Sequence, residues 1–251
     1  MDMKKIDVGI LHLAAKHNFI ELFLYILEDL NIPPKTLHPY IDAQNKAQRT
    51  PLMLAISKNH MQLTQLLINK GKCDYMKRTH TGTSLIMAVE SNNLEMVKYI
   101  RGLDGVQVDQ QDESGLTPIY VSCHNGSVEI VEYLLSQGAN LNVRGPKDST
   151  VLHTAAERDF YEIIKLILEK DPELIYEQDE NGNTALHTAI VWSSMNVIQL
   201  MFSKGGEKLT RIKNFEAEDA VEIALSENQS EPYKYLCQQL GIKEQWTCYI
   251  F

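Results

Sequence analysis

The side chains of this sequence that could do chemistry are its histidines, cysteines and paired acids. His12, His153 and His187 recur along the chain, and imidazoles bind metals or exchange protons near neutral pH. Cys123 and His124 have the types of a nucleophile and a base, but adjacent helical residues do not face each other. The sequence has no zinc-type cysteine spacing and no zinc-protease, phosphate-loop, dinucleotide-binding or nucleophile-elbow motif. We therefore expect no enzyme activity, no cofactor and no metal site.

The charge balance indicates which class of partner the chain can bind. The chain has 24 Lys and Arg against 33 Asp and Glu, a net charge of -9, and no compact basic stripe, so nucleic-acid binding is not expected. A protein partner with a basic or mixed-charge surface is favoured. The four scattered cysteines are typical of a reducing compartment. With no signal-peptide pattern and no apolar run long enough to span a bilayer, we expect a cytoplasmic monomer.

One threonine recurs every 33 or 34 residues, at Thr50, Thr83, Thr117, Thr150 and Thr184. Each begins a copy of the pattern T-P-L-H-x-A, and two degenerate copies flank these five. The clear copies are Thr50–Ala55, Thr150–Ala155 and Thr184–Ala189, the looser ones Thr83–Ala88 and Thr117–Ser122, and the terminal ones Gly9–Ala14 and Asp219–Ala224. This period and this motif resemble those of the ankyrin-repeat family.

The resemblance implies an all-α fold, an ankyrin-repeat solenoid of stacked helix-turn-helix units with short β-hairpin or loop fingers. It predicts one ankyrin-repeat domain over residues 1–244 and a tail over residues 245–251. The units are predicted at about residues 7–40, 41–74, 75–107, 108–141, 142–175, 176–209 and 210–244. The two end units have the features of caps, and the last one carries acids where the others carry T-P-L-H.

Local chemistry agrees with these units. The turn between the two helices is predicted at Asn18, Asn59, Asn92, Gly126, Asp159, Ser193 and Asn228, mostly residue types that tolerate a left-handed backbone. The recurring threonine is suited to cap the first helix, and Gly71, Gly138 and Gly205 to end the second. Small residues are expected where neighbouring units approach closely, at Ala14, Ala55, Ala88, Ser122, Ala155, Ala189 and Ala224.

The recurring histidines and the acid pairs, which could do chemistry, are explained more simply by structural roles. The resemblance implies that His12, His153 and His187 hydrogen-bond locally between repeats. The acid pairs Asp112–Glu113 and Asp179–Glu180 fall in the fingers, where we interpret them as solvated turn residues.

Two links between units are irregular. Residues Leu30–Tyr40, with three prolines, and Arg101–Val106 depart from the period. Because loops accept insertions at low cost, tolerated insertion is favoured, with a functional role as the alternative.

The resemblance also implies a concave binding face made of first helices and fingers. The predicted partner-binding residues are Lys58, Lys77, Arg78, Glu90, Glu113, His124, Arg144, Glu157, Arg158, Glu180 and Trp192. An exposed tryptophan is a strong candidate for a binding hot spot. Packing of Trp192 under the neighbouring finger is the equal alternative.

The last four residues, Cys248 to Phe251, resemble a geranylgeranyl-type prenylation box, although Tyr249 departs from the preferred aliphatic residue. No polybasic stretch precedes the box, so a lipid on Cys248 would give weak membrane association. A hydrophobic tail packed on the last repeat is the alternative.

We conclude from the sequence that the chain is a non-enzymatic interaction module, a scaffold, adaptor or inhibitor. One alternative is an adaptor recruited to membranes through Cys248 and secreted into a host cytosol, because some ankyrin proteins that intracellular bacteria deliver into host cells have degenerate repeats and such a terminal box. An enzyme with an unrecognised site is the other alternative.

Overall fold

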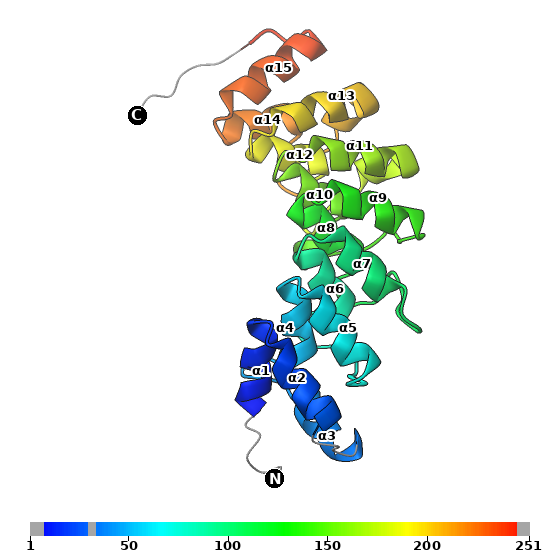
Figure 1. Cartoon of the computed structure of the whole chain (residues 1–251). Helices are drawn as coiled ribbons and strands as arrows, with labels where there is room; N and C mark the ends of the chain where they lie inside the picture. The colour runs from blue at the N-terminus through cyan, green and yellow to red at the C-terminus, as the bar shows by residue number, and fades with distance from the viewer. Residues whose placement is uncertain (1–7, 30–33, 245–251) are drawn as a thin grey trace. The chain divides into compact units, whose positions relative to one another are not determined.

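The computed structural model describes residues 8–29 and 34–244, and these residues contain seven helix pairs, with one additional helix, α3, between the first and second pairs (Figure 1). The pairs are α1 (Val8–Lys16) with α2 (Ile20–Leu24), α4 (Pro51–Ser57) with α5 (Met61–Asn69), α6 (Ser84–Glu90) with α7 (Leu94–Arg101), α8 (Pro118–Asn125) with α9 (Val128–Ser136), α10 (Val151–Ala156) with α11 (Tyr161–Lys170), α12 (Ala185–Val191) with α13 (Met195–Thr210), and α14 (Ala220–Ser226) with α15 (Ser230–Leu240). The predicted all-α repeat architecture is confirmed.

The fingers between the pairs are loops. Among the described residues they contain two isolated β-bridges, Thr79 with Gly82 and Gln178 with Thr184, and no longer strand. Two fingers also carry short 3-10 turns, Pro146–Asp148 and Pro172–Tyr176.

The chain forms two compact units, Met1–Val121 and Ser122–Phe251, and the boundary falls inside α8. In the first unit, α4 contacts both α1 and α6, and α2 contacts α5. In the second unit, α12 contacts both α10 and α14, and α11 contacts α9 and α13. Within the second unit the first helices of the pairs form one layer and the second helices form another (Figure 1).

All seven predicted turn residues adopt the left-handed backbone, with φ between 50° and 76°. Six are Gly, Asn or Asp, the types for which this conformation costs least. The seventh turn residue is a serine, Ser193, and it has the same left-handed backbone, with φ 54°. The position in the repeat therefore imposes this conformation even on serine. The prediction of where each helix pair turns is confirmed.

The recurring threonines cap the first helices. The Thr50 hydroxyl accepts the backbone N–H of Met53 at 3.3 Å, and the Thr83 hydroxyl accepts that of Ile86 at 3.2 Å. In the last repeat Asp219 caps the first helix instead, in a capping box with Glu222. Each cap satisfies N–H groups that a helix leaves without an intrahelical partner.

His12 and His153 connect neighbouring repeats. Nδ1 of His153 accepts the backbone N–H of Thr150 at 3.3 Å, which assigns the ring proton to Nε2. Nε2–H then donates to the carbonyl of Asn183 in the next repeat at 2.8 Å. In the first unit, Nε2 of His12 lies 2.9 Å from the carbonyl of Arg49. The predicted bonding between repeats is confirmed for His12 and His153, and Nδ1 of His187 accepts the N–H of Thr184 at the start of its own helix at 3.1 Å. The described residues contain no cluster suited to a metal ion.

The core lies between the helix layers and across the interfaces of neighbouring repeats. The small residues predicted at those interfaces are all buried, none with more than 1% of its surface exposed, namely Ala14, Ala55, Ala88, Ser122, Ala155, Ala189 and Ala224. The second helices contribute larger side chains such as Ile163, Ile164 and Ile167, which have no exposed surface. Because α11 touches helices on both sides, stacking supplies the burial that one repeat lacks.

The glycines predicted to end the second helices lie at those ends. Gly71 and Gly138 follow the ends of α5 and α9, and Gly205 lies one residue before a kink in α13, after which a further helical stretch continues to Thr210. A Cβ on Gly205 would lie 2.6 Å from Cβ of Leu209, so this glycine is needed for close packing. The backbone kink occurs one residue later, at Gly206, with φ 57° and ψ -152°.

The two irregular links lie in the first unit, and both make contacts with it. The insertion after the first pair contains α3 (Pro34–Ile41), whose Leu37 and Ile41 side chains are buried in the core. Before it, α2 continues as a π-helical turn, Tyr25–Asp29, and Glu28 pairs with Lys70. The Arg101 guanidinium donates to the Val106 carbonyl at 3.0 Å and closes the second irregular link.

Cys248 and the rest of the tail lie outside the described residues, so the prenylation hypothesis stays a prediction. Within the described ranges, no helix combines the length and the apolar character needed to cross a membrane. The single-domain assignment likewise stays a prediction.

The buried histidines predict a pH-dependent stability. Burial lowers the pKa of both His153 and His187 below the ordinary value of 6.5. Well above pH 6.5 these two imidazoles are neutral in both the folded and the unfolded chain. Below it the unfolded chain binds protons that the folded chain takes up less readily, so the free energy of unfolding falls as the pH falls. For each histidine, every pH unit by which folding lowers the pKa reduces the free energy of unfolding at low pH by about 1.4 kcal/mol.

Urea unfolding at pH 7.5 and pH 5.5 measures this effect, since carboxylates titrate mostly below that window. We expect lower stability at the lower pH and a smaller decrease in the double variant His153→Gln/His187→Gln. An equal decrease in the variant and the wild type would show that other groups cause it.

Candidate protein-binding face

Consecutive fingers are joined by backbone hydrogen bonds. In the first unit, the N–H of Glu113 donates to the carbonyl of Thr79 at 3.4 Å. In the second unit, Glu180 donates to Lys147 at 3.1 Å, and Phe215 donates to Asn181 at 2.9 Å. Each bond joins residues 33 or 34 positions apart, so equivalent places in successive repeats are held side by side.

Each of four fingers is shaped by one Asp or Asn near its tip. The side-chain oxygen of Asn45, Asp112, Asp179 or Asn214 accepts the N–H groups two and four residues later, at 2.8 to 3.1 Å. Asp112 is only 4% exposed, so its interpretation as a solvated turn residue is wrong. Its carboxylate is buried because the finger's own amides replace water around it.

The predicted basic residues at the finger tips donate hydrogen bonds to backbone carbonyls of the chain itself. Lys77 donates to the Asp42 carbonyl at 2.8 Å, and Arg78 donates to the Asp112 carbonyl at 2.8 Å. Arg144 donates to the Gln178 carbonyl at 2.9 Å and also pairs with Glu177. These three cations tie one finger to the next, which reduces what they can offer to a partner.

The first unit contains an open hollow of about 610 Å³ between its first helices and fingers. It is lined by His12, Leu13, Lys16, Asn45, Ala47, Arg49, Leu54, Ser57, Lys58, Thr81, Glu90 and Ser91. Three of these side chains are basic and one is acidic. Burial among the hollow's atoms raises the pKa of Glu90, with Arg49 acting in the opposite direction.

The second unit contains a smaller hollow of about 350 Å³, between α12 and α14 and the fingers that precede them. It is lined by Asn181, Asn183, Val191, Asn214, Phe215, Glu216, Glu218, Ile223 and Glu227. Here the charged lining is acidic throughout. The two hollows therefore differ in the sign of their charge.

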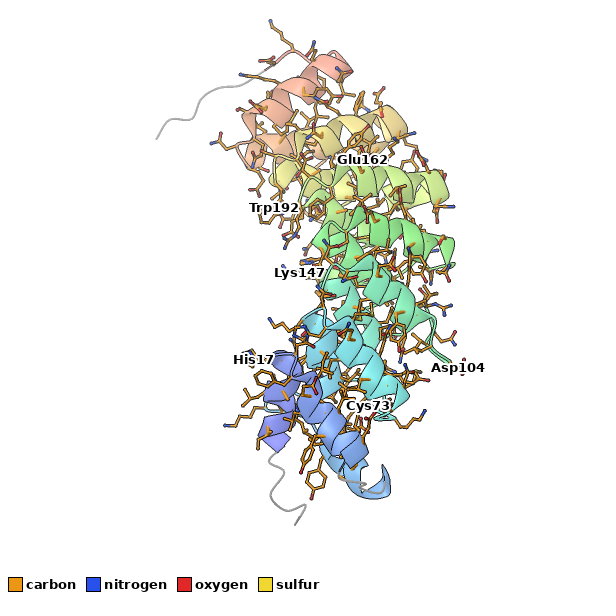
Figure 2. The ribbon with its side chains drawn as sticks, viewed as in Figure 1. His17, Cys73, Asp104, Lys147, Glu162 and Trp192 are labelled. Carbon is orange, nitrogen blue, oxygen red and sulfur yellow. The ribbon has the colours of Figure 1, made fainter. Side chains whose placement is uncertain are left out.

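Trp192 follows α12 directly and is 59% exposed, so it does not pack beneath the neighbouring finger. Figure 2 shows it on the same edge of the second unit as Lys147. Its neighbour Val191 lines the acidic hollow. The sequence therefore located an exposed aromatic side chain at the end of a first helix, beside a hollow.

The remaining predicted residues lie at first-helix ends and finger tips. Arg158 donates to Nε2 of His124 at 3.2 Å, linking two successive first helices. Glu157 is half-buried and Glu180 is exposed. Glu113 lies 3.0 Å from His80 and forms an ion pair when that imidazole is protonated.

Cys123 is unsuited to catalysis beside His124. The thiol has no exposed surface, and burial raises the pKa of Cys123 to about 12, so the thiolate is not populated at neutral pH. His124 is engaged with Arg158 and with the Asn125 side chain instead.

Sequence reasoning missed Phe215, whose side chain is 77% exposed at the tip of the last finger. The predicted binding residues end at Trp192 and include none from the last finger. An aromatic residue immediately after the tip-forming Asn214, where other repeats carry polar residues such as Glu113 and Glu180, was the available signal.

The amino-acid sequence matches a family model described as ankyrin repeats (3 copies), over residues 11–112, 85–175 and 144–213. The chain belongs to the ankyrin-repeat family. Ankyrin repeats are generally protein-interaction modules and are typically not enzymes.

Similar ankyrin proteins come from different kinds of organism. The chain is 28% identical over 236 residues to the ankyrin repeat protein OPG189 of Variola virus, covering 89% of the chain and 41% of that protein. It is 26% identical to the human transient receptor potential cation channel subfamily A member 1, over 80% of the chain and 18% of the channel. It is 24% identical to the phosphocholine transferase AnkX of Legionella pneumophila, over 89% of the chain and 24% of the transferase. The chain thus spans less than half the length of each of these relatives.

A solved structure has a similar fold. It is titled as the predatory endopeptidase Bd0816 from Bdellovibrio bacteriovorus in complex with the immunity protein Bd3460. The similarity has a TM-score of 0.68 at 25% identity and covers 78% of this chain and 99% of the matched chain.

The contact between the last two fingers predicts an asymmetric pair of glycine variants. A Cβ on Gly182 would lie 2.7 Å from Cδ1 and 2.9 Å from the backbone nitrogen of Phe215. Gly115 occupies the equivalent place in an earlier finger, with a similar φ of 82° against 75° and no atom within 4 Å of the added Cβ. Both alanine variants bear the left-handed backbone cost of roughly 1 to 2 kcal/mol. Gly182→Ala should lose a further 1 kcal/mol or more, roughly the cost of overpacking.

Urea denaturation of Gly182→Ala and Gly115→Ala measures the difference directly. Equal losses would show that the Phe215 contact does not hold the last finger against its neighbour.

Proposed function

We propose that this ankyrin-repeat chain is a non-enzymatic scaffold, adaptor or inhibitor that binds a protein partner on its first-helix ends and finger tips. The observation that carries the proposal is that these elements line an open hollow in each unit. In the first unit the hollow is lined by Lys58 and Glu90, two of the predicted binding residues. In the second unit it lies beside Trp192.

The distribution of exposed side chains supports this face over the opposite one. Among the described residues of the second unit, Trp192 and Phe215 are the most exposed aromatic residues, at 59% and 77%, and both belong to the first-helix and finger side. Tyr161, on the second helix α11, is 37% exposed. Tryptophan in particular is enriched among residues that contribute most to binding energy.

The charges of the lining support a partner of mixed charge. Lys16, Arg49 and Lys58 face the first hollow together with Glu90, whereas three glutamates face the second. The proposed partner therefore presents both acidic and basic segments, and the proposed binding unit is a monomer of this chain.

The setting we propose is a cytosol. The described cysteines Cys73, Cys123 and Cys237 are buried and free, which suits a reducing compartment. Similarity to AnkX of Legionella pneumophila supports the more specific proposal of a host-targeted effector.

Affinity purification from eukaryotic cytosol followed by mass spectrometry tests the proposal, with three single variants beside the wild type. Trp192→Ala and Lys58→Glu change the proposed face, and Tyr161→Ala removes an exposed aromatic ring from the second-helix layer as a matched control. Truncation of a hot-spot residue costs about 2 kcal/mol or more, roughly 30-fold in affinity. We expect a captured protein whose recovery falls for the first two variants and stays at the wild-type level for Tyr161→Ala.

Wild-type recovery of the same proteins by both face variants would contradict this location of the site. Loss of the captured protein only with Tyr161→Ala would move the site to the second helices.

A further inference from the structure

The hollow of the second unit has an apolar side and a charged side. Val191 at the end of α12 and Ile223 in α14 line the apolar side, together with the exposed ring of Phe215. Glu216 and Glu218 in the last finger and Glu227 after α14 provide the charge.

The negative charge of this hollow is not compensated by the chain's own cations. Of the two basic residues in the same finger, Lys213 donates to the Glu222 carboxylate at 2.9 Å and to the Ala217 carbonyl at 2.7 Å, and Arg211 pairs with Glu207. Across residues 8–29 and 34–244, no ion pair involves Glu216, Glu218 or Glu227. Three carboxylates on a hollow of about 350 Å³ attract a cation more strongly than isolated surface carboxylates do.

The aromatic side chain is held in place for contact. The N–H of Phe215 donates to the Asn181 carbonyl at 2.9 Å, and its ring lies where a side chain on Gly182 would otherwise stand. The ring nevertheless remains 77% exposed. A ring face near carboxylates suits a side chain with an aliphatic stem and a cationic head, because the stem packs on the ring and cations are attracted to its face.

From this combination we infer that the hollow binds an extended, lysine- or arginine-bearing segment of the partner protein. The aliphatic stem of one basic side chain lies against Val191 and Phe215, and its charged head lies among Glu216, Glu218 and Glu227. The inference rests on the proposed function and adds the chemical class of the segment that enters this site.

The first unit's hollow provides an internal contrast. Lys16, Arg49 and Lys58 outnumber Glu90 in its lining, so a basic segment is repelled there. Recognition of a cationic segment is therefore specific to the hollow between α12 and α14, and does not follow from the chain's net charge of -9 alone.

Selection of peptides on the full chain tests the inference without knowledge of the partner. A library of random twelve-residue peptides is selected on the immobilised wild-type protein, and enriched peptides are then measured by fluorescence anisotropy. We expect enrichment of Lys or Arg next to an apolar residue. Affinity should fall at least tenfold in the triple variant Glu216→Gln/Glu218→Gln/Glu227→Gln and also in Phe215→Ala.

A matched triple variant, Glu129→Gln/Glu132→Gln/Glu169→Gln, removes the same charge from exposed positions on α9 and α11. It should keep wild-type affinity, and thermal unfolding monitored by circular dichroism confirms that each variant is folded. The inference is wrong if no peptide is enriched, if enriched peptides lack basic residues, or if the two triple variants bind equally. Capture of a cytosolic partner that still depends on Trp192 or Lys58 would then leave the proposed function standing.

Discussion

A helix pair of this chain cannot bury its apolar side chains alone, and contact between successive pairs is the constraint on which the rest of the structure depends. The interfaces carry alanine or serine with at most 1% of the surface exposed, so backbones approach closely. At the same interfaces the His153 imidazole caps its own helix on one side and donates to the Asn183 carbonyl of the next repeat on the other. One side chain thus fixes both the start of a helix and the position of its neighbour.

The same constraint determines which polar groups are available to a partner. Finger amides are satisfied by Asp112, Asp179 and their counterparts, and finger carbonyls by Arg78 and Arg144. Side chains at first-helix ends and in the last finger, such as Trp192 and Glu216, stay exposed. A partner that docks there need not compete with the hydrogen bonds that hold the repeats together.

The fold could be predicted from the sequence because its determinants are local and repeated. The left-handed turn at Asn59 and the threonine cap at Thr50 depend on a few neighbouring residues, and copies of the same pattern confirm one another. The candidate site was less predictable because its contacts join residues more than 30 positions apart. Arg78 looked available as a finger cation, yet its partner is the Asp112 carbonyl in the next finger. The exposure of Phe215 likewise depends on Gly182 in the preceding finger.

Hydrogen–deuterium exchange of the chain with and without its captured partner tests the central claim most directly, because it maps the contact face without any substitution. The account predicts slower exchange in residues 184–192 and 210–219, which carry Trp192 and Phe215, with α11 unchanged. Slower exchange confined to the second helices, with these two segments unchanged, would contradict it.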